Sequence, residues 1–333
     1  MNATKPVLLV TGADLAPQAL ALLGDFDVVY AGRTPSAHDI VGLCVRHDPT
    51  AIIVRYGRID AAAIAAAPSL RVVSKHGAGT DTIDKTAAAA RDIDVVAAAG
   101  ANAAAVAEHA LALLLACAKS VPQLDQRMRA GHWDKSTHKS VELGGRTIGL
   151  VGLGAIGVRF ARMVDAMDMR VIGFDPYAND VPRFVERVDE LDAIWRESDV
   201  VSLHCPLTAD NAGMVNADTL GRCKRGVVLV NTARGGLVDE DALLAALRSG
   251  QVAAAGLDRN TTSGATLSGS RSVPTACSLG HLPVLSKTSR PRGVESIMRV
   301  APLGMMALQV TPYLAMALAV DHVRPMMPAL AAA

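Results

Sequence analysis

The sequence predicts an α/β protein with two doubly wound domains. Short runs rich in Val, Ile and Leu alternate with alanine-rich stretches, which is the pattern of βα units around a parallel sheet. The alternation forms two series, separated by a long apolar stretch at residues 103–119. The chain has 333 residues, 50% of them hydrophobic, which is more than one domain core usually holds. Length and pattern together therefore indicate two domains.

The first series ends near residue 100. Its strand candidates lie at residues 7–10, 27–31, 51–56, 71–75 and 94–99. Its helix candidates lie between them, at residues 15–23, 36–46, 60–67 and 82–91. An apolar helix at 103–119, interrupted only by Glu108 and His109, leads into the second series.

The second series repeats the pattern. We expect strands at residues 146–152, 169–175, 199–204, 226–231 and 252–258. We expect helices at residues 156–167 and 239–249. Both series have the alternation that an open parallel sheet covered by helices requires.

The alternation stops after Asp258. Residues 259–293 contain seven Ser, five Thr and four Arg, and no acidic residue occurs between Asp258 and Glu295. No helical or strand period is visible there, so we expect no regular element in this segment. An apolar helical texture returns at residue 294.

Residues 300–320 carry no charge and are numerous enough to span a bilayer. Pro302 and Pro312, with Gln309 and Thr311 in the same run, favour a buried core helix or two short helices. We therefore expect no membrane span.

Charge and cysteine content restrict the class of protein. The chain carries 33 Lys and Arg against 32 Asp and Glu, which argues against a nucleic-acid surface or a polybasic membrane patch and favours a small-molecule partner. The five cysteines are scattered and no CxxC pair occurs, so neither a disulfide framework nor a zinc site is indicated. The first apolar run is too short for a signal peptide. These features predict a cytoplasmic protein without a metal site.

The strongest local motif is RTIGLVGLGAIG, in which a strand candidate runs into Gly152, Gly154 and Gly157 with the spacing GxGxxG. The first glycine permits a tight turn, the second lets the backbone approach a pyrophosphate, and the third allows close packing of helix on strand. We expect the phosphates at the helix N-terminus, beside the N–H groups of Ala155 and Ile156. A lone GxGxxG is a weak signal, but here a strand precedes it and a helix follows.

Asp175 strengthens the dinucleotide interpretation. It ends the next strand candidate, 18 residues after Gly157, close to the spacing of the acidic residue that binds ribose hydroxyls. A carboxylate would repel a 2′-phosphate, so we predict NAD rather than NADP as the cofactor. The alternative is a solvated Asp near an ordinary glycine turn.

Several further segments resemble the D-isomer-specific 2-hydroxyacid dehydrogenases, the family of phosphoglycerate, glycerate and formate dehydrogenases. In the family's order, they are KHGAGTDTID (75–84), NAAAVAEHALALLLA (102–116), GGRTIGLVGLGAIG (144–157), HCPLT (204–208), GMVN (213–216) and NTARGGLVDEDALLAAL (231–247). The resemblance implies two Rossmann-like domains with a cleft between them. Residues 1–100 plus 294–333 would form a flavodoxin-like substrate domain, and residues 101–285 the NAD-binding domain.

The resemblance also implies roles for single residues. Arg234 matches the arginine that orients the 2-keto acid, and a guanidinium offers paired donors to a carboxylate. Gly77, Ala78 and Gly79 resemble the loop whose backbone N–H groups hold the substrate carboxylate, with a plain turn as the competing interpretation. Packing or capping is the alternative for the remaining cofactor-lining positions, which are Val106, Cys205, Pro206, Thr232, Ala233 and Asp258.

Two catalytic features of the family are not matched. The carboxylate that holds the catalytic histidine protonated normally lies five residues after the Asp of a GLD segment, where this sequence has Ser263. The histidine normally lies in a TPHIGG-like turn, whereas this sequence offers His281 in LGHLP, which an exposed loop histidine would equally explain. One hypothesis for both departures is a shifted reading frame across residues 259–293, and a diverged loop is its rival.

The sequence thus predicts a NAD-dependent oxidoreductase that interconverts a small D-2-hydroxy acid and its 2-keto acid, with Arg234 binding substrate and His281 carrying the proton. The alternative is a catalytically weak or inactive NAD-binding protein with a sensor or interaction role, because the Glu and His motifs are disrupted. A chain too damaged at 259–293 to fold is a third possibility. We also expect a homodimer that uses the helix at 103–119.

Overall fold

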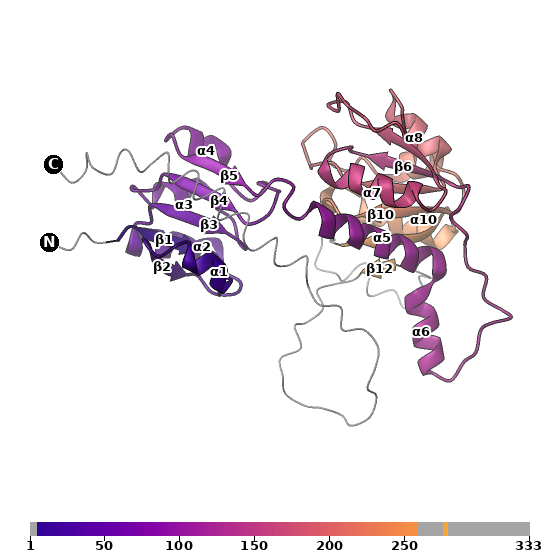
Figure 1. The fold of residues 1–333 in the computed structure, drawn as a ribbon, viewed down its shortest axis with the longest axis horizontal. Coiled ribbons are helices and arrows are strands. Elements are labelled where there is room, and N and C mark those ends of the chain that lie inside the picture. The colour runs from indigo at the N-terminus through magenta and orange to yellow at the C-terminus, as the bar shows by residue number, and fades with distance from the viewer. Residues whose placement is uncertain (1–4, 259–275, 279–333) are drawn as a thin grey trace. The chain divides into compact units, whose positions relative to one another are not determined.

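The computed structural model describes residues 5–258 and 276–278. The chain divides into two compact units, and the boundary lies between Asn102 and Ala103 (Figure 1). Each unit contains one sheet in which every strand pair is parallel, so the predicted α/β class is confirmed. The assignment of residues 1–100 plus 294–333 to a substrate domain and of 101–285 to an NAD domain stays a prediction, and residues 294–333 lie outside the described residues.

The first unit has a five-stranded sheet in the order β2-β1-β3-β4-β5, which is the strand order of flavodoxin-like sheets. The strands are β1 (Val7–Val10), β2 (Asp27–Tyr30), β3 (Ala51–Val54), β4 (Val72–Lys75) and β5 (Asp94–Ala97). The helices are α1 (Pro17–Ala21), α2 (Ala37–His47), α3 (Ala61–Ala65) and α4 (Lys85–Ala89). Ile40 of α2 and Ile64 of α3 pack on one face of the sheet, and Ala19 of α1 packs on the other.

Side-chain caps explain where the helices of the first unit begin. Ser36 forms a capping box with Asp39 at the start of α2. Asp60 and Asp84 accept hydrogen bonds from backbone N–H groups in the first turns of α3 and α4. The predicted helices at 15–23, 60–67 and 82–91 are therefore shorter in the structure, because the predicted ranges included caps and flanking turns.

The second unit has a seven-stranded sheet in the order β12-β11-β10-β9-β6-β7-β8. The strands are β6 (Thr147–Val151), β7 (Arg170–Phe174), β8 (Val185–Arg187), β9 (Val200–Leu203), β10 (Val227–Asn231), β11 (Val252–Leu257) and β12 (Ala276–Ser278). The helices are α5 (Ala103–Lys119), α6 (Val121–Arg129), α7 (Ala155–Asp165), α8 (Leu191–Glu197), α9 (Ala217–Arg222) and α10 (Glu240–Ser249), with a 3-10 turn η1 (Gly235–Leu237).

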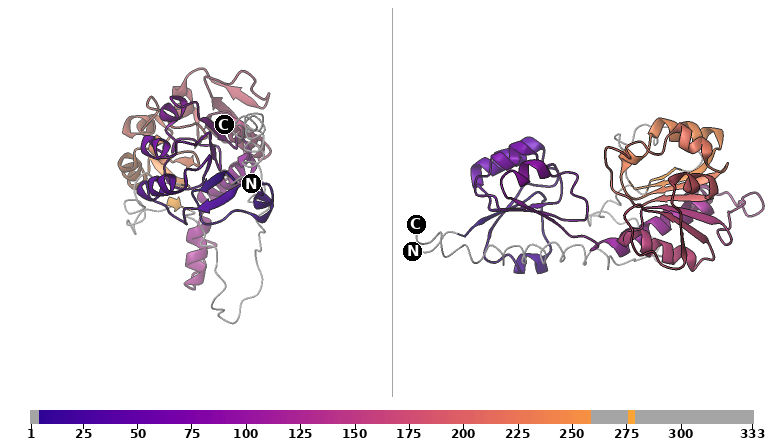
Figure 2. Two further views of the ribbon diagram at one scale, coloured as in Figure 1. Left: turned by 90° about the vertical axis from the view of Figure 1, so that its left-hand side faces the viewer. Right: turned by 90° about the horizontal axis from the view of Figure 1, so that it is seen from above.

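Helices cover both faces of this second sheet (Figure 2). Leu113 of α5 and Phe160 of α7 belong to the hydrophobic core on one face. Trp195 of α8 and Leu243 of α10 belong to the core on the other face. The interior strand β6, between β9 and β7, is buried along its whole length, as expected for a strand covered on both sides.

Two differences from the predicted elements have clear causes. The strand expected at 51–56 ends at Val54, where the backbone N–H of Arg55 donates to the Thr11 hydroxyl instead of continuing the ladder. The segment 259–293 was expected to hold no regular element. Residues Ala276–Ser278 within it form strand β12, which pairs with β11, so the expectation is wrong for these residues. A strand at the edge of a sheet pairs through its backbone groups, so its sequence does not need a regular hydrophobic pattern.

In the part of the chain that the structure describes, no single helix has the length and apolar character needed to cross a membrane. Helices α5 and α6 meet these criteria only when taken together, and they are bent by 60° at their junction. The uncharged run at 300–320 lies outside the described residues.

Candidate functional site

The glycine turn between β6 and α7 has the geometry that the GxGxxG spacing predicts. Gly152 has a φ of 100°, and a Cβ there would lie 2.8 Å from the backbone of both His204 and Cys205. A Cβ on Gly157 would lie 2.1 Å from the carbonyl oxygen of Gly152. Only glycine fits at these two positions, because any side chain would push α7 or the β9 loop away from the turn.

Gly154 is the N-cap of α7 and differs from the other two glycines. No atom lies within 4 Å of the position that its Cβ would occupy, so its surroundings are open. No side chain caps the helix, which leaves the first-turn N–H groups of Ala155 and Ile156 without a helical acceptor. These N–H groups and the positive end of the helix dipole form a place where an anion such as a pyrophosphate can bind.

Asp175 lies beside this turn, directly after β7. One carboxylate oxygen accepts a hydrogen bond of 2.8 Å from the backbone N–H of Leu153, and the other accepts one of 2.9 Å from Tyr177. Burial raises the pKa of the Cys205 thiol, and the negative charge of Asp175 raises it further. Cys205 and Asp175 follow the parallel strands β9 and β7 at the same edge of the sheet, where the carboxylate retains lone pairs for sugar hydroxyls.

His204, which precedes the predicted residues Cys205 and Pro206, was not singled out from the sequence. Its Nε2 lies 3.0 Å from the Ser202 hydroxyl, and its ring centroid lies 5.1 Å from that of Phe160. Its Nδ1 is buried without a hydrogen-bond partner among the described residues. Burial lowers the pKa of His204 to about 4, so the imidazole behind the glycine turn is neutral at pH 7.

Buried Asn231 organises the loop that follows β10. Its side-chain oxygen accepts a 3.0 Å hydrogen bond from the Ala233 N–H, and its side-chain nitrogen donates to the Arg234 carbonyl at 2.8 Å. The Thr232 hydroxyl is buried and has no hydrogen-bond partner in the described part of the chain. The Arg234 guanidinium donates to the Ala233 carbonyl at 2.8 Å. The loop is thus fixed by hydrogen bonds, and Thr232 retains a polar group for a ligand.

Asp258 follows β11 and is tied to the same loop, since its backbone N–H donates to the Asn231 carbonyl at 3.0 Å. One oxygen of its carboxylate lies 3.5 Å from Nε2 of His109 on α5. Val106, one helical turn before His109, is partly buried. Asp258 thus joins the β10 loop to α5 at the carboxyl edge of the sheet.

The predicted substrate loop lies at the carboxyl edge of the first sheet, after β4. Gly77 has a φ of 128°, which favours glycine, and its carbonyl accepts a 3.1 Å hydrogen bond from Ala98. Burial, together with the positive charge of Arg55, lowers the pKa of His76 to about 4. The Lys75 ammonium lies 3.5 Å from the Arg55 carbonyl. The edge beside the glycine turn thus carries the basic residues Lys75 and Arg55, of which Arg55 also forms an ion pair with Asp14.

Arg55, Lys75 and His76 were not predicted from the sequence. The available signal was their position, because each directly follows or ends a buried parallel strand, where ligands of such sheets bind.

The residues predicted to bind the dinucleotide lie after β6, β7, β9, β10 and β11, and Val106 on α5 lies one turn from the His109 that faces Asp258. Their chemistry fits a dinucleotide: two glycines that no side chain can replace, an uncapped helix N-terminus, and the unpaired Thr232 hydroxyl. His281 and Ser263 lie outside the described residues. Within the described ranges, no group of three or more His, Cys, Asp or Glu side chains is arranged to hold a metal ion.

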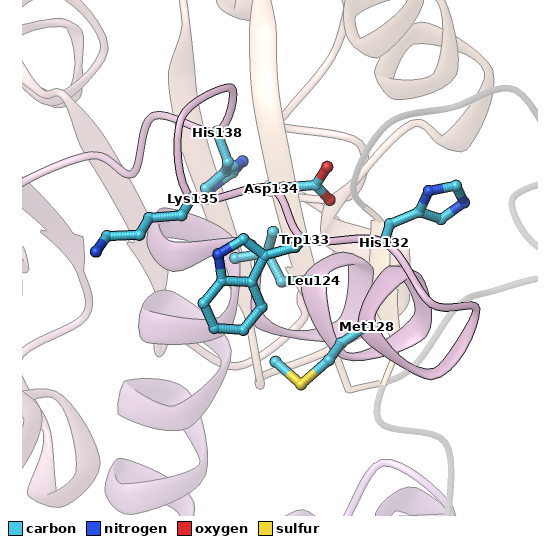
Figure 3. Close-up of a pocket in the computed structure, with 7 residues that line it drawn as sticks. All are labelled: Leu124, Met128, His132, Trp133, Asp134, Lys135 and His138. Carbon is cyan, nitrogen blue, oxygen red and sulfur yellow. The ribbon is translucent and has the colours of Figure 1, made fainter.

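Two pockets of the second unit lie away from this edge. One, of about 290 Å³, lies between α6 and the loop that follows it, and Figure 3 shows the side chains that line it, including Leu124, Met128 and Trp133. The other, of about 270 Å³, lies near the amino ends of the strands, where Arg146, Asp199 and Gly226 line it. Neither pocket contains a residue of the glycine turn.

Comparison with known proteins places this site in a wider group. Residues 111–269 match the model of the D-isomer specific 2-hydroxyacid dehydrogenase NAD binding domain, which confirms that the chain holds an NAD-binding domain. D-3-phosphoglycerate dehydrogenase of Mycobacterium tuberculosis is 39% identical over 256 residues, which cover 76% of this chain and 48% of that protein. Hydroxypyruvate reductase of Thermotoga maritima is 41% identical over 201 residues, which cover 60% of this chain and 65% of that protein. The chain spans about half the length of the phosphoglycerate dehydrogenases that it matches.

Solved structures agree with this. The TT0316 protein from Thermus thermophilus superposes with a TM-score of 0.71 and 34% identity, covering 77% of this chain and 82% of that one. A glyoxylate reductase from Paecilomyes thermophila superposes with a TM-score of 0.70 and 29% identity, covering 78% of this chain and 83% of that one.

Proposed function

Because the chain belongs to the D-isomer specific 2-hydroxyacid dehydrogenase family, we propose that it is a NAD-dependent oxidoreductase that interconverts a small D-2-hydroxy acid and its 2-keto acid. The observation that carries the proposal is the shared sheet edge, at which the glycine turn, Asp175 and the Arg234 loop all follow parallel strands. A dinucleotide site and an arginine suited to a carboxylate lie together there.

NAD, when bound, accepts or donates the hydride. We propose that the N–H groups of Ala155 and Ile156 bind its pyrophosphate and that Asp175 accepts hydrogen bonds from ribose hydroxyls. The carboxylate of Asp175 favours NAD over NADP because it would repel a 2′-phosphate. The other proposed contacts are made by Val106, Gly152, Gly154, Gly157, Cys205, Pro206, Thr232, Ala233 and Asp258.

Arg234 is the proposed substrate-orienting residue. Its guanidinium can donate to the substrate carboxylate and to the neighbouring carbonyl oxygen, which polarises that carbonyl for reduction. The backbone N–H groups of Gly77, Ala78 and Gly79 are proposed to bind a carboxylate oxygen at the edge where Arg55 and Lys75 also lie. His281 is proposed to carry the proton, without a carboxylate at Ser263 to assist it.

Titration with NADH, followed by turnover with glyoxylate, hydroxypyruvate and pyruvate, tests this proposal. We expect NADH to bind and at least one of these acids to be reduced. Arg234→Ala should lower kcat/KM by roughly 100-fold or more, the loss expected for a charged, bidentate contact in the transition state. Arg183→Ala, at an exposed position of the same unit, is the matched control and should be active.

NADH binding without turnover on any of these acids would instead support the alternative of a catalytically weak NAD-binding protein. That alternative is motivated by the Ser263 position, because no carboxylate is available there. Failure of folded protein to bind NADH would refute both functions.

We propose that the protein is a homodimer, with α6 and its following loop as the interface rather than α5. Seven of the 17 side chains of α5 are buried within its own unit, among them Leu113 and Leu114. In contrast, α6 has no buried residue, and Met128 and Trp133 are 60% and 76% exposed. Apolar groups this exposed are typical of an interface. Sedimentation should give twice the mass of 34.6 kDa, and Met128→Glu with Trp133→Glu should give the single-chain mass.

A cytoplasmic location is part of the same proposal. Cys44, Cys205 and Cys223 are free thiols, and two of them are buried, which suits a reducing compartment. The even charge balance gives no reason to expect nucleic acid or a membrane surface as partner. Fractionation of cells that express the protein would test the location.

A further inference from the structure

We infer that His109 is a positioning residue that holds the Asp258 carboxylate for the nicotinamide half of the cofactor. This inference rests on the proposed function, in which Asp258 is one of the cofactor contacts. His109 is not among those contacts, and it lies on α5, one helical turn after Val106.

The packing of α5 on β11 fixes the distance between the two side chains. A Cβ built on Gly256 would lie 2.9 Å from the Cβ of Leu113, so helix and strand approach as closely as a glycine permits. His109 lies one helical turn before Leu113, on the same face of the helix. Asp258 lies two residues after Gly256, further along the strand. This register brings the imidazole opposite the carboxylate.

The imidazole is poised for contact with the carboxylate. Its Nε2 is buried and has no hydrogen-bond partner in the described ranges, although Oδ1 of Asp258 lies 3.5 Å away. A hydrogen bond between these atoms would have a length of about 2.9 Å, so a movement of about half an ångström would form it. The His109 and Asp258 side chains are 32% and 45% exposed, which leaves the carboxylate accessible to a ligand.

Asp258 is also connected to the substrate side of the site. Its backbone N–H binds the Asn231 carbonyl, and the Asn231 side chain binds the Arg234 carbonyl. A contact from His109 that fixes Asp258 would therefore also restrict the motion of the loop after β10, which carries Arg234. A change at His109 should therefore weaken contacts with the nicotinamide end of the cofactor only. The adenosine end is proposed to bind Asp175, which follows β7, on the other side of β6 from β11.

Separate affinities for NADH and ADP-ribose test the inference, because ADP-ribose contains the adenosine and pyrophosphate but lacks the nicotinamide. We expect His109→Phe to weaken NADH binding by about three- to tenfold, the range for a partly exposed charged contact, and to leave ADP-ribose affinity within about twofold. His109→Gln retains a side-chain N–H donor and should restore most of the NADH affinity. Glu108→Gln, at the exposed neighbouring position, should bind both ligands as the wild type does.

A double variant completes the test. If His109 acts through Asp258, adding His109→Phe to Asp258→Asn should cost less than about twofold in NADH affinity beyond the single Asp258 change. Equal losses of NADH and ADP-ribose, or no NADH loss in His109→Phe, would overturn the inference. These outcomes are separate from failure of the proposed function, in which the wild-type protein itself would bind no NADH.

Discussion

Acidification should destabilise the second unit through His204. The perturbation is a fall in pH from 7.5 to 4.5. Over most of this range the buried imidazole stays neutral in the folded protein, whereas the same side chain in the unfolded chain takes up a proton. Burial lowers the pKa of His204 to about 4 in the folded protein, against 6.5 for the free side chain. Because the folded pKa is the lower one, the unfolded state binds more protons between these values. The contribution of the neutral His204 to the stability of the folded state is therefore fully present above pH 6.5, and it is lost as the pH falls toward 4.

The size of the effect follows from the two pKa values. Linkage between them gives a loss of about 1.4 kcal/mol at pH 5.5 and about 2.5 kcal/mol at pH 4.5. Aspartates with lowered pKa values, such as Asp39 and Asp134, lose their stabilising charge only at still lower pH. The window from pH 6.5 to 4.5 therefore isolates buried histidine.

Tryptophan fluorescence provides an assay for the second unit alone. Both tryptophans of the chain lie there, and Trp195 is 3% exposed, so its emission shifts when the unit unfolds. Urea unfolding of wild-type protein and of His204→Gln should be compared across the pH window. The wild type should lose about 2.5 kcal/mol and the variant less than about 1 kcal/mol, whatever its stability at pH 7.5. His132→Gln, at an exposed loop position, should behave as the wild type. Equal pH slopes for wild type and His204→Gln would refute the reasoning.

Three further predictions concern single substitutions. Gly157→Ala should lower the free energy of unfolding by about 1–3 kcal/mol, because its Cβ would overlap the Gly152 carbonyl. Gly154→Ala should keep normal stability and lose NADH affinity. Equal melting temperatures for the two variants would contradict this. Because the pKa of His76 is lowered in the folded protein, the first unit should lose stability, and β4 should lose hydrogen-exchange protection, as the pH falls below 6.5. His76→Gln should remove this acid-induced loss. Unchanged exchange of the wild type at pH 5 would oppose the prediction. Asn231→Ala should cost about 2 kcal/mol in urea unfolding, because two side-chain hydrogen bonds are lost in a buried position.

The parallel-sheet architecture could be predicted because its central strands are buried on both faces. Runs such as those of β3, β6 and β10 consist almost wholly of apolar residues, and such runs are visible in a single sequence. Helix α5 begins and ends as predicted because its apolar stretch is long and is interrupted only by Glu108 and His109. Helices α6, α8 and α9 were not predicted, because they are shorter than α5 and mix apolar with charged residues. The three-residue strands β8 and β12 were also missed, since both pair at sheet edges through backbone groups.

The glycine turn was predictable for a different reason. Its spacing encodes backbone geometry directly, so Gly152 and Gly157 lie where the pattern requires them. His109 and His204 were missed because their importance depends on what faces them across the sheet. An imidazole near a carboxylate, or one buried behind a turn, gives no signal until distant segments of the chain are placed side by side.

The two hydrogen bonds of Asp175 limit how the cofactor preference of this protein can be redesigned. One carboxylate oxygen accepts a hydrogen bond from the Leu153 N–H within the glycine turn, and in the proposed NAD site the negative charge of the same group would oppose an extra phosphate on the sugar. Exchange for alanine or arginine to admit NADP would also remove the acceptor that braces the turn. Asparagine or serine would retain an acceptor without the negative charge, so these residues are the better starting points for an NADP-accepting variant.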